Sequence, residues 1–298
     1  MSHFPTKILL ATDGSKDAFL ALRAAVDLSA RTGSELHVVH AWLPFPDHSH
    51  PSIAVAPDAA LYEREAQKLL FEELDKVEAA GGAASGGHLE RGRPAETISD
   101  LAEELEVGLV VVGSRGLGPV MRLVMGSVSE AVIDLATCPV LVLRGGEGAW
   151  PPSRVVVGDD SSPGAKGAGD LAASIAGIVG ASVLLVRAVP MVRDVSEAAR
   201  FVEDAAALPH QATLGRHELF LAARARRLEE ASGLRPRVRV RGGEAASSLI
   251  LEAAEEGEGP PLIAVGRRGL GPLERLRLGS VSTKVLRAAM GPVLVIPS

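Results

Sequence analysis

The sequence has very few cysteines, which could form disulfides, and very few aromatic residues, which could fill a core with large rings. Its single cysteine, Cys138, excludes an intrachain disulfide and a zinc site made of cysteines, and the proline and apolar run after it predict a packed, inert thiol. Aromatic residues make up 3% of the 298 residues. This length predicts two domains, whose cores must consist of Ala, Val, Leu and Ile packed between layers.

An excess of basic charge and an apolar run of membrane length are also lacking. The formal net charge is −6, which together with the few aromatic residues argues against a nucleic-acid partner. The longest uncharged run, 171–186, is shorter than the ~18–20 residues of a membrane helix. Gly180 within it predicts a helix that turns into a buried strand. Because the N-terminus does not resemble a signal peptide, we expect a cytoplasmic protein with no membrane partner.

The familiar catalytic motifs are missing from the sequence. It contains no lysine-bearing phosphate loop, no His-Glu-x-x-His and no Gly-x-Ser-x-Gly. The run Asp47-His48-Ser49-His50 has metal donors but no matching partners elsewhere. The sequence therefore predicts no catalytic and no metal-binding residues.

A long internal repeat is the most informative feature that is present. Residues 113–129 read GSRGLGPVMRLVMGSVS, and residues 266–282 read GRRGLGPLERLRLGSVS. An apolar run precedes each copy, and a second apolar run follows each copy after Pro139 or Pro292. Two long copies indicate a duplicated domain rather than a solenoid. We expect domains at 1–146 and 153–298, joined by a Gly- and Pro-rich linker at 145–153.

Strand and helix signals alternate within the first copy. Short apolar runs predict strands at 8–12, 36–42, 88–91, 109–112 and 140–143. Helices are expected from Ser15 to the stop at Gly33, and at 61–77, 94–105 and 128–136. The second copy follows the same plan with a longer, Ala-rich connection at 190–232. The order predicts an α/β fold of two tandem doubly wound domains, each a five-stranded parallel sheet with helices on both faces.

The repeated segment begins where such sheets bind ligands, at the carboxyl end of a strand. Gly113 and Gly116 are expected to let the backbone approach a ligand or adopt a positive φ. Ser127 is expected to be the N-cap of the following helix, with Glu130 completing a capping box. The backbone N–H groups after Ser127 then have no partner within the helix and form an anion site. Positive charge could come from Arg115 and Arg122, so a phosphate chain is the expected guest.

These residues resemble a known family. The pattern Gly-x-x-Gly, nine residues, Gly-Ser, on an α/β unit whose first strand ends in Asp, is similar to the ATP-binding branch of the universal stress protein family. The resemblance covers almost the whole chain, once per half. It implies a tandem member that binds ATP, with Mg²⁺, and acts as a nucleotide-responsive stress sensor or regulator. An efficient ATPase needs a positioned base, a metal-binding carboxylate and stabilisation of the transition-state charge, so we expect at most slow ATP hydrolysis. It also implies that 139–144 and 292–297 pair between the halves, and that two chains form a homodimer.

The resemblance assigns ligand contacts to the strand ends and glycine loops of both halves. Asp13 and Asp160 would contact the ribose and adenine end, backbone near Ala41 and Ala188 would border the base, and the glycine loops would hold the phosphates. In the first half the implied residues are Ala11, Asp13, Ala41, Gly113, Ser114, Arg115, Gly116, Gly126, Ser127, Val128 and Ser129. In the second half they are Gly158, Asp160, Ala188, Gly266, Arg267, Arg268, Gly269, Gly279, Ser280, Val281 and Ser282.

Several alternatives stay open at this stage. The motif could survive as a turn in a nucleotide-free interaction scaffold, and the ligand could be ADP, AMP or a cyclic nucleotide. Asp13 could be the N-cap of the first helix. His40 is expected to be a hydrogen-bonded structural residue, and the acidic run 252–258 a solvated helix end. In the second half, Asp159 adds a carboxylate beside the nucleotide, which Arg267 and Arg268 would offset.

Overall fold

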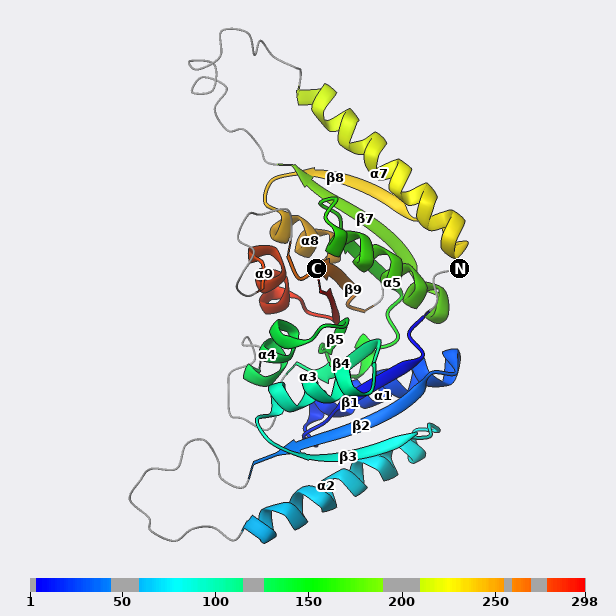
Figure 1. Cartoon of the computed structure of the whole chain (residues 1–298). Coiled ribbons are helices and arrows are strands. Elements are labelled where there is room, and N and C mark those ends of the chain that lie inside the picture. Colours follow the sequence, from blue (N-terminus) through cyan, green and yellow to red (C-terminus); the bar gives the residue numbers. More distant parts are fainter. Residues whose placement is uncertain are drawn as a thin grey trace, which may run out of the picture. The chain divides into compact units, whose positions relative to one another are not determined.

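The structure is a computed structural model that describes residues 4–43, 59–114, 126–189, 210–254, 259–268 and 278–297. The chain divides into two compact units (Figure 1). The first unit contains Phe4–Pro151 together with Met290–Pro297, and the second contains Pro152–Ala289. The predicted loop at 44–57 and the run 255–258 lie outside the described residues.

The first unit is a doubly wound sheet. Its strands run in the order β3-β2-β1-β4-β5-β10, and β1 to β5 are parallel. Helices α1 and α2 pack against each other, as do α3 and α4, which fits right-handed crossovers that place the two pairs on opposite faces. The elements are β1 Lys7–Ala11, α1 Lys16–Thr32, β2 Glu35–Trp42, α2 Ala59–Ala79, β3 Gly86–Arg91, α3 Pro94–Glu104, β4 Leu109–Gly113, α4 Ser127–Leu135, β5 Val140–Leu143, η1 Glu147–Ala149 and β10 Val293–Ile296.

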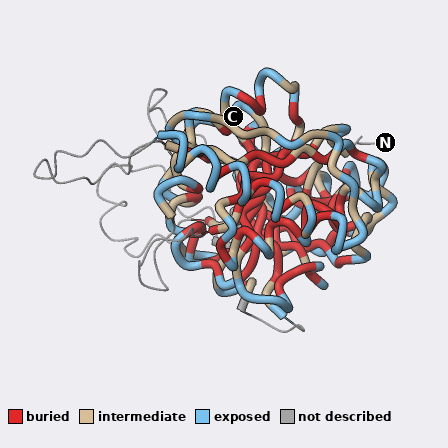
Figure 2. Tube along the Cα trace, turned by 90° about the horizontal axis from the view of Figure 1, so that it is seen from below, coloured by how far each residue is buried: buried red, intermediate tan, exposed pale blue. Residues whose placement is uncertain are grey.

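The second unit repeats this plan. Its strands run in the order β9-β6-β7-β8. Strand β6 is parallel to both of its neighbours, β9 and β7, and β7 is parallel to β8. The elements are β6 Arg154–Gly158, α5 Pro163–Val179, β7 Ser182–Val189, α7 His210–Ser232, β8 Arg237–Gly242, α8 Ala245–Ala254, β9 Leu262–Gly266 and α9 Ser280–Ala288. The predicted α/β class and the duplication are confirmed. Buried residues gather along the strands of both units (red in Figure 2).

Local sequence signals explain where the first helix of each unit begins and ends. The Ser15 hydroxyl accepts a hydrogen bond from the Ala18 N–H and caps α1, which stops at Gly33 with φ 72°. Ser162 caps α5 in the same way, and α5 stops at Gly180 with φ 77° before β7. The uncharged run 171–186 is therefore a helix that turns into a buried strand, as predicted. In the part of the chain that is described, no helix combines the length and apolarity that membrane crossing requires.

The last strand of the sequence, β10, pairs with the first repeat. It runs antiparallel to β5 with Leu294 opposite Leu141, and its residues are 0–7% exposed. The expected pairing between 139–144 and 292–297 is confirmed. Strands that are apolar on both faces can bury their side chains only in a sheet that is covered on both sides. Their pairing also gives hydrogen-bond partners to the backbone N–H and C=O groups that an edge strand leaves unpaired.

A pair of histidines lies across β2 and β3. His37 Nδ1 is 3.1 Å from His88 Nε2, so one ring donates to the other. Burial, and then the charge of His37, lower the pKa of His88, while Glu90 and Glu104 act in the opposite direction. Folding therefore favours the neutral form of His88.

This pair predicts a loss of stability in mild acid. Below the ordinary pKa of 6.5, the unfolded chain takes up a proton that folded His88 resists, so the free energy of unfolding should fall as the pH falls. His88→Gln keeps a donor toward His37 and should lose less stability than the wild type between pH 7.5 and 5.5. Urea midpoints across this range test the prediction, and parallel curves for the two proteins would contradict it.

Candidate anion-binding site

The candidate site of each unit lies at the carboxyl edge of its parallel strands. In the first unit, β1 and β4 are neighbours and the chain leaves them toward different helices, which is the topological switch point of a doubly wound sheet. The turn after β1, the turn after β4 and the start of α4 meet at this edge. The second unit brings together the ends of β6 and β9 and the start of α9.

The turn after the first strand is the same in both units. Asp13 Oδ1 accepts the Ser15 N–H at 3.0 Å, and Asp160 Oδ1 accepts the Ser162 N–H at 2.9 Å. Each carboxylate thereby orients its own turn, and the serine two residues later caps the helix. The idea that Asp13 is the N-cap of the first helix is wrong, because Ser15 holds that position. Asp13 is half-buried and Asp160 is exposed.

A pair of hydrogen bonds closes the base of each glycine loop. The Ser114 carbonyl accepts the Gly126 N–H at 2.7 Å and the Ser129 hydroxyl at 3.1 Å. The Arg267 carbonyl accepts the Gly279 N–H and the Ser282 hydroxyl, both at 2.8 Å. We call this arrangement the clasp. It returns the chain from the loop to the strand end, so the helix that follows must start there.

The start of that helix differs by one residue from the prediction. Gly126 is the N-cap of α4, with φ −67° and ψ 143°, and Gly279 is the N-cap of α9. Ser127 is therefore the first helical residue, and the expectation that it caps the helix with Glu130 in a capping box is wrong. The Glu130 N–H bonds the Gly126 carbonyl, which starts the helix one residue earlier.

The exposed start of α4 presents backbone donors. Ser127 and Val128 are exposed, and the first N–H groups of a helix have no acceptor within it. Ser129 and Ser282 are buried, and their hydroxyls are used in the clasp, so only their amides are left to face a ligand. At the corresponding start of α9, Ser280 is exposed and Val281 is half-buried. Each unit thus directs amides and a positive helix end toward its strand edge.

Gly113 and Gly266, the first glycines of the two loops, are required for close packing and do not adopt a positive φ. A Cβ on Gly113 would lie 2.6 Å from Ala18 N in the backbone of α1, and a Cβ on Gly266 would lie 2.8 Å from the carbonyl carbon of Gly164. Positive φ values occur at other glycines of the described residues. The space over Gly113 and Gly266 therefore belongs to the first turn of α1 and α5.

A buried polar pair that the sequence did not reveal supports the turn of the first unit. The Thr12 hydroxyl donates to Glu73 Oε2 at 2.7 Å, and Glu73, on α2, is 1% exposed. Lys76 Nζ lies 2.5 Å from Glu73 Oε1 and balances its charge. His40 Nδ1 lies 2.9 Å from the Thr12 carbonyl, so its predicted structural role is confirmed. Thr12 and Glu73 are 61 residues apart, which is why no local pattern indicated the pair.

The corresponding turn of the second unit is also supported by a buried polar contact, but there the turn carries the carboxylate and the helix carries the positive charge. Asp159, at the position of Thr12, is 5% exposed and lies 3.8 Å from Arg224 Nε and 3.9 Å from Arg187 Nη2. Arg187 also donates to the Ser161 hydroxyl and lies 4.6 Å above the ring centre of Phe220. Arg187 and Arg224 therefore compensate the charge of Asp159, and the offset expected from Arg267 and Arg268 stays a prediction.

The other predicted contacts are distributed along the same edge. Ala11 and Gly158 end β1 and β6, while Ala41 and Ala188 are half-buried near the ends of β2 and β7. Arg115, Gly116, Arg122 and Gly269, and the run 47–50, lie outside the described residues.

Two further predictions can be compared with the structure. Burial raises the pKa of the half-buried Cys138 thiol to about 11, which favours the predicted inert cysteine. Glu252 is not part of a solvated helix end, because it is 1% exposed and bonds Arg239 and Arg241. The pairing arginines come from β8 and lie 13 and 11 residues before Glu252 in the sequence, so no local pattern links them to the acidic run.

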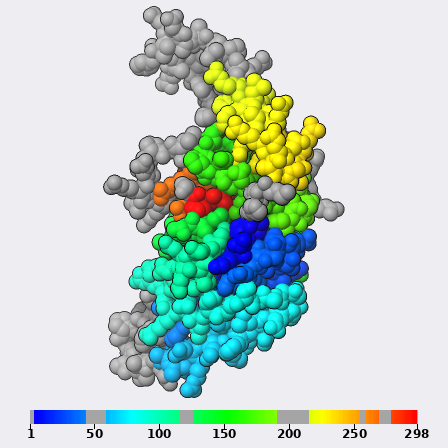
Figure 3. All heavy atoms as spheres, turned by 45° about the vertical axis from the view of Figure 1, so that its right-hand side comes forward, coloured from blue at the N-terminus to red at the C-terminus, as the bar shows by residue number. Residues whose placement is uncertain are grey.

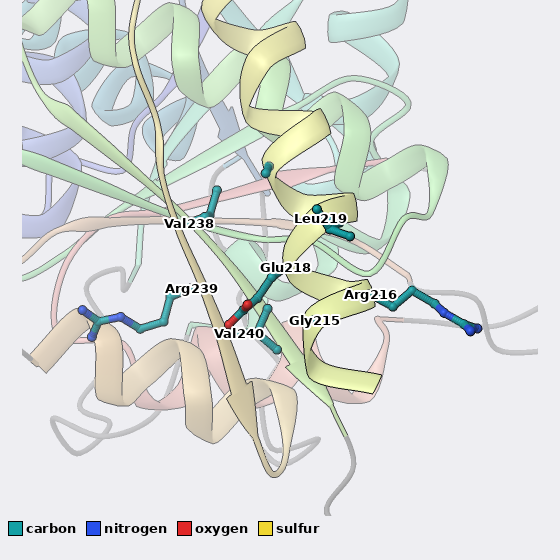
Figure 4. A pocket seen from close by; sticks show the side chains of 8 residues that line it. Gly215, Arg216, Glu218, Leu219, Val238, Arg239 and Val240 are labelled. Atoms are coloured by element: carbon teal, nitrogen blue, oxygen red, sulfur yellow. The ribbon is translucent and has the colours of Figure 1, made fainter. Parts of the chain in front are cut away.

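A groove of about 840 Å³ lies between α7 and β8 (Figure 4). It contains none of the predicted ligand residues. Leu219, one of its lining residues, is 75% exposed and belongs to α7, whose atoms are yellow in Figure 3. Its lining residues are Gly215, Arg216, Glu218, Leu219, Ala222, Val238, Arg239 and Val240.

Comparison with known proteins gives one consistent result. The model of the universal stress protein family matches residues 5–144 and 152–297. A universal stress protein from the QAH/OAS sulfhydrylase 3′ region of Thermus aquaticus is 39% identical over 142 residues, which are 46% of this chain and 97% of that protein. The universal stress protein YxiE of Bacillus subtilis is 35% identical over 146 residues, again 46% of this chain and 98% of that protein.

Similarity to solved structures extends over nearly the full chain. A universal stress protein from Archaeoglobus fulgidus is 22% identical, covers 98% of both chains and has a TM-score of 0.68. At this identity the match concerns the fold, and it extends through both units.

Proposed function

The chain belongs to the universal stress protein family, and on this premise we propose that each unit binds ATP at the carboxyl edge of its sheet and that the chain acts as a nucleotide-responsive regulator. The observation that carries the proposal is the clasped loop, which occurs twice and is followed each time by a helix start with exposed residues. Backbone amides at a helix N-terminus bind phosphate without a lysine. The choice of adenine rests on the resemblance of the motif, and the choice of phosphate rests on the geometry.

Magnesium would enter with the nucleotide. Among the described residues, no three His, Cys, Asp or Glu side chains gather as a metal cage. Because Mg²⁺ is commonly held by substrate phosphates and one or two carboxylates, we expect the phosphates to supply most of its ligands. A bound nucleotide would favour the loop conformation for which it has the higher affinity. A partner protein could recognise the resulting change in loop conformation.

The first experiment identifies the ligand that the protein retains. Freshly purified protein is denatured, and the supernatant is separated by ion exchange. Retained ATP supports the proposal, ADP alone indicates turnover, and an absence of nucleotide, followed by no binding of added Mg-ATP in calorimetry, would favour a nucleotide-free scaffold.

A second experiment tests the backbone amides directly. Ser127→Pro removes the first N–H of α4, and Ser280→Pro does the same for α9. Proline suits the first helical position, and the preceding Gly126 already has φ −67° and ψ 143°, which a residue before proline requires. A hydrogen bond to a charged group contributes about 1.5–3 kcal/mol, so each proline should weaken ATP binding at its own site by about 10- to 100-fold.

The matched controls are Ser127→Ala and Ser280→Ala, which remove the hydroxyl and keep the amide. They should bind ATP within about threefold of the wild type if the backbone is the principal donor, since that difference is below 1 kcal/mol. Equal losses in the alanine and proline variants would show that the hydroxyls, and not the amides, hold the phosphates.

A further inference from the structure

The two loops differ in one pair of residues at their base. In the first unit the Ser114 hydroxyl donates to Asp17 Oδ2 at 2.6 Å, and Ser114 is 0% exposed. In the second unit Arg267 stands in the place of Ser114, and Gly164 stands in the place of Asp17. The correspondence is structural, because Gly113 packs on the backbone of Asp17 in the same way that Gly266 packs on the backbone of Gly164.

The two replacements fit each other. Asp17 places a carboxylate beside Ser114, whereas Gly164, at the corresponding position, has no side chain that could crowd the much larger Arg267. Together they replace one negative charge by one positive charge. This change lies beside the clasp, because the carbonyls of Ser114 and Arg267 are the acceptors that close the loops.

Some of the other charges at the two edges correspond, whereas Glu130 in the first turn of α4 is replaced by Thr283 in α9, which also makes the second edge less negative. Asp13 and Asp160 make the same turn, and Arg115 and Arg268 occupy the same position in the sequence repeat. The buried clusters under the two turns each contain charges of both signs. The Asp17–Ser114 pair and its Gly164–Arg267 counterpart are therefore the electrostatic difference that lies at the base of the loops themselves.

We propose that the second unit selects nucleotides by the number of their phosphates and favours a triphosphate over a monophosphate more strongly than the first unit does. The inference rests on the proposed function. A difference of two charges at the loop base acts more strongly on a longer, more negative phosphate chain. At physiological salt, screening reduces the effect, and we expect the ratio of ATP to AMP affinity to be about tenfold higher in the second unit.

The test uses chains with one competent site. Ser280→Pro leaves the first unit as the binding site, and Ser127→Pro leaves the second. Calorimetry with AMP, ADP and ATP at 0.15 M salt gives the affinity ratio of each. In the Ser127→Pro background, Arg267→Gln should lower the ATP to AMP ratio, and Arg267→Lys, which keeps the charge, should preserve it. In the Ser280→Pro background, Asp17→Asn should raise the ratio while keeping an acceptor for Ser114.

The outcomes separate this inference from the proposed function. If the wild-type chain binds no nucleotide, the proposed function fails. If both units bind with equal ATP to AMP ratios, or if Arg267→Gln weakens AMP and ATP by the same factor, nucleotide binding stands and the charge selection is wrong. A ratio that is higher in the second unit and falls toward that of the first at 1 M salt supports the inference.

Discussion

Replacing Gly113 by alanine is expected to destabilise the first unit by about 3 kcal/mol or more, because overpacking against a rigid backbone is costly. The added Cβ would lie 2.6 Å from both Ala18 N and the Asp17 carbonyl carbon. Neither atom can rotate away, so α1 must shift from the sheet. A substitution here would therefore not be a clean test of ligand contact, because loss of the fold would accompany any loss of binding.

Tryptophan fluorescence during urea unfolding measures this effect. The two tryptophans of the chain, Trp42 and Trp150, both belong to the first unit, so the signal follows that unit alone. Gly148→Ala is the control, because a Cβ there meets nothing within 4 Å and the residue lies in the same unit. It should leave the midpoint nearly unchanged. A Gly113→Ala midpoint equal to that of the control would refute the packing role.

Thr12→Asp should be similarly damaging, and Glu73→Arg should rescue it. The single change places a second carboxylate against Glu73, which is 1% exposed and 2.7 Å from the Thr12 hydroxyl. An uncompensated buried charge costs about 3–5 kcal/mol. The double variant reproduces the pairing of Asp159 with Arg224 in the second unit. We expect it to recover most of the lost stability.

The same fluorescence assay gives a double-mutant cycle for Thr12 and Glu73. A coupling of about 3 kcal/mol in favour of the double variant is expected, at the upper end of values for residues in contact. Thr12→Val is the size-matched control and should cost about 1–3 kcal/mol, since it removes one hydrogen bond from a buried carboxylate. If Thr12→Asp and Thr12→Val are equally stable, the buried charge of Glu73 is not what the turn depends on.

Local signals predicted most of the helices and strands. The run 109–112 is four consecutive apolar residues, and it became β4 with all four buried. Helix 61–77 was predicted in the right place, although α2 extends two residues further at each end. The start of α4 was misjudged by one residue, because a serine is a frequent N-cap while glycine, which here holds that position, has no side chain to signal it.

The duplication, the α/β class and the position of the glycine loops can be predicted from the amino-acid order, because a repeat, an apolar run and a glycine spacing are visible without knowing any three-dimensional contact. Other roles emerge only once the chain is folded: Gly113 makes room for α1, Ser129 closes a clasp, and Thr12 depends on Glu73 while Asp159 depends on Arg187 and Arg224. Each of these roles depends on which distant backbone or charge comes within a few ångströms. That proximity is set by packing across the whole unit and is not encoded in any local pattern.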